Sequence, residues 1–470
     1  MYTSKMIRVY KSLSDAELRK FKKWVYSPFA NRHTDVQKMI EFLMSRASIS
    51  PATTNKERAY NFIFPDETID LKKLRYVMAY TLDVLEEFIA YMAFSRNKSD
   101  FNNILAKEYR ERKLSSFANE SLENFKETLK NYPLKDSNAL RKHFDYELEN
   151  LYQIGDENRH GFFNFKEVVS TLNVYYIAET LKHACSILMH ETMSDKKYEI
   201  PLIDSILEEV EKNDYEQYPA VLVYFYIYKS LLSPSENYYF DKLMPLLDNN
   251  EQFFTHSEWK DVYLFTINYS IKRVNSIDGD YQTLFSLYKK SLEKGYLLNM
   301  NEIDKFAYRN ITRVGLILGE YDWVKTFLEE YKDKLDPKYK EQVYLINLAQ
   351  YYFSIKAFDK TMPLLLTVEY SDVLHVIGAK LMLMKIYYET NEFDALDSFI
   401  ESFGTFLKRK KKLGYHKKVY LNILNMTKLL LKLDDYDIIE KERVRAKIEM
   451  TKPVGEKNWL MEQLNKKNKR

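Results

Sequence analysis

Hydrophobic positions near the start of the chain repeat at the spacing of an α-helix. Apolar residues recur three and four residues apart, at Leu18, Phe21, Trp24 and Val25. This spacing is typical of a helix that buries one face. Ser14 and Glu17 have the spacing of a capping box, so the helix is predicted to begin at Asp15.

The same period predicts further helices in residues 1–100, which we interpret as a separate N-terminal helical module. A second helix is expected from Thr34 or Asp35, and a long one from about Leu71 to Phe94. The segment 62–66 followed by this long helix loosely resembles the winged-helix module that some bacterial activators place before a repeat domain. The resemblance implies DNA binding, but acidic residues follow the cations Lys72, Lys73 and Arg75 and would repel phosphate: Asp83, Glu86 and Glu87.

Residues 101–165 are predicted to form connecting helices. Gly155 and Gly161 enclose a polar stretch that is the best candidate for a loop. Helical hairpins are expected over residues 166–451. A polar, basic tail covers residues 452–470.

An aromatic pair repeats in the second half of the chain. Tyr352 and Phe358 are followed 35 residues later by Tyr387 and Phe393, close to the period of about 34 residues of helix-turn-helix repeats. Aromatic residues beside turns recur at intervals of 35 to 43 residues, at Tyr198, Phe240, Tyr281, Tyr321, Phe358, Phe393 and Tyr436. The pattern predicts an irregular array of stacked helical hairpins.

Ala349, Tyr352 and Phe358 match the frame of tetratricopeptide-like repeats, in which a small residue, an aromatic and a turn precede an aromatic that opens the second helix. A second set matches this frame in part: Leu383, Tyr387 and Phe393. The second half of the chain therefore resembles the tetratricopeptide-like repeat family. The resemblance implies a right-handed α-solenoid that binds peptides or partner proteins.

Composition agrees with an all-α fold. Among 470 residues there are only 10 Gly and 11 Pro, few for a protein built from sheets and tight turns. The net charge of +3 provides no global field for nucleic acid or membrane. A single Cys185 indicates a reducing compartment, and the longest apolar run, 220–228, is far shorter than a membrane span. We expect a cytoplasmic protein with no membrane partner.

Motifs of several enzyme classes are absent from the sequence. It contains no zinc-protease His-Glu-x-x-His, phosphate-binding loop, dinucleotide glycine fingerprint or paired-cysteine metal site. Glu179, His183 and His190 share a predicted helical face and could ligate a metal. We favour the alternative, in which His183 pairs with Glu179 and Cys185 packs as a small apolar residue. No enzyme, cofactor or metal site is predicted.

The densest positive charge is a basic run beside Gly414, composed of Lys408, Arg409, Lys410, Lys411 and Lys412. Such a run can dock phosphate, an acidic partner or a membrane surface. It also fits a solvated loop between two helices, which we favour.

A basic stripe is predicted in the groove of the repeats. In tetratricopeptide-like repeats, the first helix lines the groove and exposes the position eight residues before the turn aromatic. Here these positions, with one residue a turn earlier, are Arg309, Arg313, Gln350, Lys385 and Lys428. The hypothesis is that they receive an acidic segment or a C-terminal carboxylate; cationic helix surfaces arising by accident are the alternative.

Together these patterns favour a non-catalytic scaffold or adaptor that binds a partner protein through a helical-repeat groove. The alternative is a transcription regulator with an N-terminal DNA-binding module and a repeat sensor domain. A protein or acidic peptide segment is the favoured partner, and a nucleic acid is the less favoured one.

Overall fold

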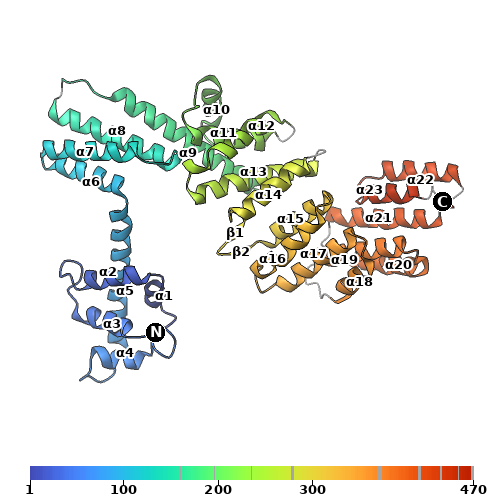
Figure 1. Cartoon of the computed structure of the whole chain (residues 1–470), viewed down its shortest axis with the longest axis horizontal. Coiled ribbons are helices and arrows are strands. Elements are labelled where there is room, and N and C mark those ends of the chain that lie inside the picture. The colour runs from blue at the N-terminus through green and yellow to red at the C-terminus, as the bar shows by residue number, and fades with distance from the viewer. Residues whose placement is uncertain are drawn as a thin grey trace. The chain divides into compact units, whose positions relative to one another are not determined.

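The protein is all-α, as predicted (Figure 1). A computed structural model describes residues 1–158, 160–194, 196–233, 236–276, 280–367, 373–410, 414–434, 437–453 and 455–466. These residues form 23 α-helices, two short 3₁₀ segments and one two-stranded antiparallel ribbon. In the ribbon, Leu298 of β1 (Leu298–Asn299) pairs with Ile303 of β2 (Glu302–Ile303).

The chain divides into two compact units. Unit 1 contains Met1–Lys229 and Tyr238–Thr255, and unit 2 contains Ser230–Asn237 and His256–Arg470. The helices that begin in unit 1 are α1 (Lys5–Lys11), α2 (Asp15–Val25), α3 (Thr34–Met44), α4 (Lys56–Ile63), α5 (Leu71–Arg96), α6 (Lys98–Glu111), α7 (Ser115–Lys130), α8 (Ser137–Glu157), α9 (Phe165–Met193), α10 (Ile203–Lys212), α11 (Pro219–Leu232), α12 (Tyr238–Asn249) and η1 (Glu251–Phe253).

The first helices begin where their capping residues place them. Ser14 and Glu17 form the predicted capping box, and α2 begins at Asp15. The predicted starts of α3 at Thr34 and of α5 at Leu71 are also confirmed. No strand lies among residues 1–158, all of which the structure describes. The resemblance to a winged helix therefore does not extend to a wing.

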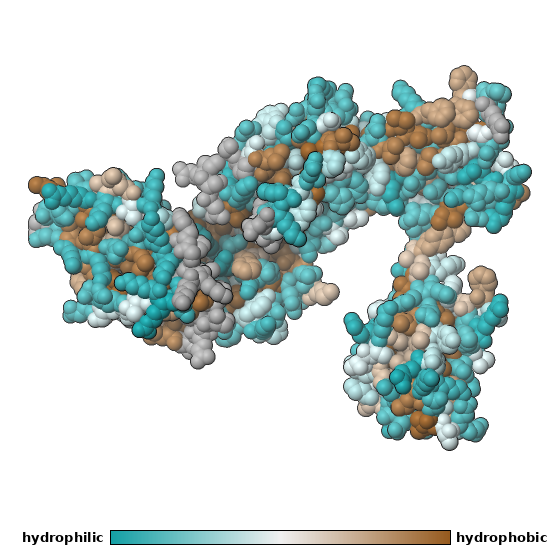
Figure 2. Space-filling view, turned by 180° about the vertical axis from the view of Figure 1, so that it is seen from behind, coloured by the Kyte–Doolittle hydropathy of each residue, from teal (hydrophilic) through white to brown (hydrophobic). Residues whose placement is uncertain are grey.

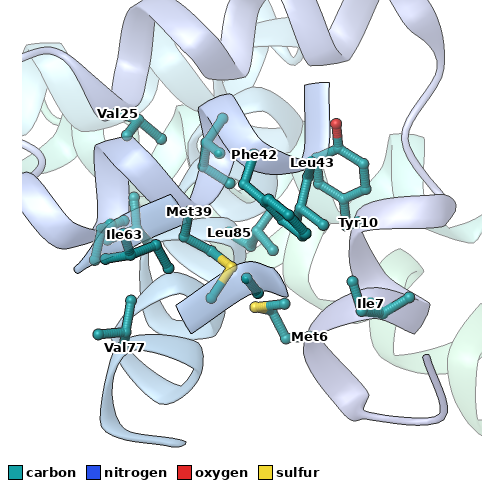
Figure 3. Packing of buried hydrophobic residues seen from close by; sticks show 14 of the residues in the cluster. Met6, Ile7, Tyr10, Val25, Met39, Phe42, Leu43, Ile63, Val77 and Leu85 are labelled. Atoms are coloured by element: carbon teal, nitrogen blue, oxygen red, sulfur yellow. The ribbon is translucent and has the colours of Figure 1, made fainter. Parts of the chain in front are cut away.

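Helices α1 to α5 enclose a hydrophobic core of their own (Figure 3). Each of the five helices contributes fully or nearly fully buried side chains, among them Met6, Ile7, Tyr10, Val25, Met39, Phe42, Leu43, Ile63, Val77 and Leu85. Phe21 of α2 packs on Phe88 of α5 with 5.2 Å between ring centroids. The N-terminal module thus has the continuous apolar interior that a helical bundle needs for stability.

The capping box gives a prediction about pH. Glu17 accepts hydrogen bonds from Ser14 and pairs with Arg96 at 2.7 Å, and these contacts lower its pKa from 4.5 to about 2. Because the pKa is lower in the folded state, the stabilisation is complete above pH 4.5 and is lost as the pH falls toward 2. Titration of the Glu17 carboxyl carbon by NMR should show this midpoint. A midpoint near 4.5, unchanged by Arg96→Ala, would contradict the prediction.

Helices α6, α7 and α8 contact one another and form a second core of unit 1. Phe125 of α7 meets Tyr146 of α8 edge to face, with 5.7 Å between centroids. The loop predicted over residues 155–161 begins later than expected, because α8 continues through Glu157. Gly155 takes part in this helix, where a single glycine is tolerated at a modest loss of stability.

Unit 2 continues with helices in close succession. They are α13 (His256–Ser276), α14 (Tyr281–Glu293), α15 (Lys305–Ile317), α16 (Tyr321–Tyr331), η2 (Lys332–Lys334), α17 (Lys340–Ser354), α18 (Phe358–Thr367), α19 (Val373–Glu389), α20 (Phe393–Arg409), α21 (Gly414–Lys432), α22 (Ile438–Met450) and α23 (Lys457–Lys466). Consecutive helices pack as the pairs α15 with α16, α17 with α18 and α19 with α20. The first helices of these pairs also contact one another, α15 with α17 and α17 with α19.

The turns inside these three pairs share one backbone geometry. Gly319, Lys356 and Asn391 have φ of 75°, 59° and 62°, and each lies two residues before the aromatic that opens the second helix. The following amide donates to the carbonyl five residues earlier in all three turns, over 3.0, 2.9 and 2.9 Å. This is the Schellman type of helix end, in which a left-handed residue satisfies the last carbonyls. The turns therefore recur at the positions that the aromatic pattern marked.

Candidate functional site

The long helix α9 carries apolar residues on two faces. One face is buried in unit 1 and includes Ile177, Leu181 and Ala184. On that face the Cys185 thiol donates to the Tyr224 carbonyl oxygen at 3.4 Å and ties α9 to α11. A helix that is apolar all round is normally covered on both sides.

The second face of α9 is exposed. Four large apolar side chains follow one another at spacings of four, three and four residues, which places them in one stripe along the first half of the helix. They are Phe165 (60% exposed), Val169 (55%), Leu172 (42%) and Tyr176 (44%). The stripe is about 16 Å long, at 1.5 Å per residue. Figure 2 shows hydrophobic side chains, coloured brown, between hydrophilic ones on the surface of unit 1.

Helix α10 lies beside this stripe and completes a groove of about 820 Å³. The α9 wall includes Phe165, Val169 and Tyr176, and Leu202 and Ile206 line the other side. Leu202, just before α10, has φ of 60° and is 63% exposed. A left-handed conformation is unfavourable for a leucine, so the fold holds an apolar side chain at the rim of the groove at the expense of local strain.

The rim formed by α10 and the residues after it is acidic. Residues 203–216 contain six carboxylates against the single cation Lys212. Of these carboxylates, Glu209 lines the groove and accepts a hydrogen bond from the Tyr215 hydroxyl at 3.2 Å. Burial, together with this neighbouring carboxylate, raises the pKa of Tyr215 to about 12. The groove therefore combines an apolar floor with a negative edge on the α10 side and one cation, Lys166, on the α9 side.

The residues predicted to form the basic stripe all lie in unit 2, but their environments differ. Arg313 on α15 is exposed, whereas Arg309 lies over the ring of Phe306 and Gln350 on α17 is half-buried. The expectation that position 385 is exposed is wrong. Lys385 is buried on α19, and its ammonium pairs with Glu456 at 2.5 Å.

Lys428, the last member of the predicted stripe, is on α21 and pairs with Glu401. That pairing lowers the pKa of the Glu401 carboxyl group. Two of the predicted cations are thus neutralised by carboxylates of the same unit. Arg309 and Arg313, one turn apart on α15, remain the exposed or half-exposed positive part of the stripe.

The structure describes only part of the basic run of residues 408–412. Lys408 and Arg409 end α20 and are exposed, and Lys410 follows with its ammonium 5.2 Å from the Phe406 ring centroid. Lys411 and Lys412 lie outside the described residues. Lys417 donates to the Lys408 carbonyl oxygen at 2.8 Å, so part of this charge satisfies the end of α20.

The residues of the suspected metal cluster do not converge. His183 is exposed and 3.9 Å from Glu179, while Cys185 faces the core. His190 is within 3.2 Å of the Ser194 hydroxyl. In the described part of the chain, no group of three or more His, Cys, Asp or Glu side chains is arranged to hold a metal ion.

Sequence reasoning missed the groove, although one signal was present. The spacing of Phe165, Val169, Leu172 and Tyr176 is visible in the sequence. A second apolar stripe on the same helix indicates either a fully buried helix or a docking face, and the pattern alone does not distinguish the two. Only the packing of α9 shows which stripe is left exposed.

Comparison with protein-family models, with curated proteins and with solved structures finds no match to this chain. Among the described residues, no helix combines the length and the apolar composition needed to cross a membrane.

Proposed function

We propose that this protein is a cytoplasmic, non-catalytic scaffold or adaptor that binds a helical segment of a partner protein. The observation that carries the proposal is the groove between α9 and α10, whose α9 wall includes the exposed side chains of Phe165, Val169 and Tyr176. Contiguous apolar surface of this kind is unfavourable in water and is a common mark of a protein interaction site.

The shape and charge of the groove define its occupant. A stripe about three turns long matches an amphipathic helix that inserts apolar residues at i, i+4 and i+7. Glu208 and Glu211 already pair with Lys212 and Lys229, but Glu209 lines the groove and favours a lysine or arginine on the flank of that helix. The proposed partner is therefore a basic amphipathic helix.

In this proposal, the hairpins of unit 2 form a right-handed, tetratricopeptide-like α-solenoid. This solenoid is the scaffold. Two observations support the repeat: the successive contacts among α15, α17 and α19, and the shared turn geometry at Gly319, Lys356 and Asn391. In a solenoid, each hairpin buries its apolar face against the next one. Arg309 and Arg313 provide a second, smaller contact surface on α15.

The test uses the full chain and two stapled helical peptides of about 16 residues. Both carry the same leucine face, but one has lysine and arginine on its flanks and the other has glutamate. We expect the basic peptide to bind and the variant Val169→Asp/Leu202→Asp to weaken binding at least about tenfold, measured by fluorescence anisotropy. Ile104→Asp on α6 is the matched control, because Ile104 is similarly exposed outside the groove.

The other outcomes are equally informative. Equal binding of the two peptides, lost in the groove variant, would retain the groove and reject a basic partner. A dimer that dissociates in the groove variant would assign the surface to a second copy of the chain. If the control variant weakens binding as much as the groove variant, or if neither peptide binds, the proposal is wrong.

A further inference from the structure

The N-terminal module carries a positively charged helix face far along the chain from the groove. Arg19, Lys22 and Lys23 are spaced three and four residues apart on α2, so they share one face, and all three are exposed. None of them forms an ion pair with another described residue, whereas Glu17 at the start of the helix is already paired with Arg96. The positive charge of this face is therefore available to a ligand.

A fixed turn after α2 presents an aromatic ring to solvent. Phe29 is 97% exposed at this turn. The buried Asn31 holds the turn, because its side-chain amide donates to the carbonyl oxygens of Val25 at 3.0 Å and of His33 at 3.1 Å. Its side-chain oxygen in turn accepts from the His33 amide at 2.9 Å. Asn31 thus joins the carbonyl end of α2 to the backbone of His33.

His33 belongs to a pocket of about 340 Å³ with aromatic walls. The pocket is lined by His33, Asp35, Val36, Lys73, Tyr76, Val77 and Tyr80. The rings of His33 and Tyr80 are stacked, with 4.7 Å between centroids and 12° between planes. Tyr76, one turn before Tyr80 on α5, is about half exposed. Stacked rings that remain open to solvent are suited to receive another flat ring.

We propose that this surface binds single-stranded nucleic acid. A base stacks on the Tyr76 and Tyr80 rings in the pocket, while backbone phosphates lie along the cations of α2. The Asp35 carboxylate, which lines the pocket, accepts a hydrogen bond from an exocyclic amino group of the base. Phe29 offers a second stacking surface for a neighbouring base.

The pocket favours single strands over a duplex and over a lipid surface. In a duplex the bases are already stacked and paired, so none is free to enter the pocket. On α5, the helix for which the winged-helix resemblance implied DNA binding, Lys73 is bound to Glu67 at 2.6 Å. An anionic membrane would also attract the α2 cations, but a lipid surface has no flat ring to place in a pocket of this shape.

The experiment measures binding of labelled oligonucleotides of about 12 nucleotides to the full chain by fluorescence anisotropy. The same sequence is tested as single-stranded RNA, single-stranded DNA and duplex DNA. We expect a single strand to bind, and Tyr76→Ala/Tyr80→Ala to weaken it at least about fivefold, the effect of losing one stacked base. Lys22→Glu/Lys23→Glu should also weaken it and flatten its dependence on salt.

Tyr91→Ala is the matched control, since Tyr91 is on α5, is half exposed and lies outside the pocket, against Trp24. Tighter binding of the RNA or of the DNA strand supports the proposal and identifies the natural form. Unchanged affinity in the double tyrosine variant, or a duplex that binds as tightly as a single strand, would overturn it. Binding to vesicles of anionic lipid without binding to any oligonucleotide would overturn it as well and assign the surface to membranes.

Discussion

Replacing Arg110 by alanine is expected to destabilise the bundle of α6, α7 and α8 by about 3 kcal/mol. The Arg110 guanidinium on α6 binds the Glu149 carboxylate on α8 at 2.6 Å and reaches Asp156 at 3.3 Å. The contact with Glu149 raises the pKa of Arg110. The side chain of Glu149 is only 8% exposed, so removal of its partner leaves a carboxylate buried without a counter-charge.

The measurement is urea unfolding of the full chain combined with hydrogen exchange of α6 to α8, because a chain of two units need not unfold in one step. Arg112→Ala is the matched control. Arg112 also pairs with a glutamate, Glu108, but both side chains are exposed, and the expected loss is below about 0.5 kcal/mol. Equal losses in the two variants would show that burial of Glu149 has no energetic consequence. The double variant Arg110→Met/Glu149→Leu should recover most of the stability.

Gly315→Ala is expected to destabilise the α15–α16 pair by about 1–3 kcal/mol. Alanine in a helix interior is ordinarily more stable than glycine by about 1 kcal/mol, so the expected sign is reversed here. Gly315 is buried on α15, where a Cβ atom would overlap a methyl group of Val324 on α16 and lie 3.3 Å from the Phe285 ring. Val324 is itself fully buried and cannot move away freely.

Hydrogen exchange of α15 and α16 is the measurement, together with urea unfolding. Gly378→Ala on α19 is the matched control, because nothing lies within 4 Å of a Cβ atom there and a small gain in stability is expected. Val324→Ala should be less harmful in the Gly315→Ala background than alone, since it removes the overlapping methyl group. Additive effects of the two substitutions would contradict the proposed clash.

Local patterns predicted the helices well where the responsible groups are neighbours in sequence. The Ser14 and Glu17 capping box placed the start of α2, and the aromatic residues at 321, 358 and 393 marked three turns whose geometry recurs. These features depend on hydrogen bonds and contacts within a few residues. A sequence displays them directly.

The candidate sites were predicted less well, because exposure depends on what packs from elsewhere in the chain. Lys385 was expected to face a groove, but Glu456, 71 residues away, covers it. The stacked rings of His33, just before α3, and Tyr80, on α5, are 47 residues apart in the sequence. The local periodicity of the sequence does not show such long-range contacts.

By itself, the sequence determined that the protein is built from helices and where many of them begin, because helical periodicity, caps and turns are short-range properties. The tertiary structure alone decided which of the two apolar stripes of α9 is buried and which lines the groove with α10. It also decided which cations are free, as on α2, and which are paired, as at Lys385. The physical reason is that burial and charge pairing are settled by neighbours brought together in space, which the order of residues along one helix does not contain.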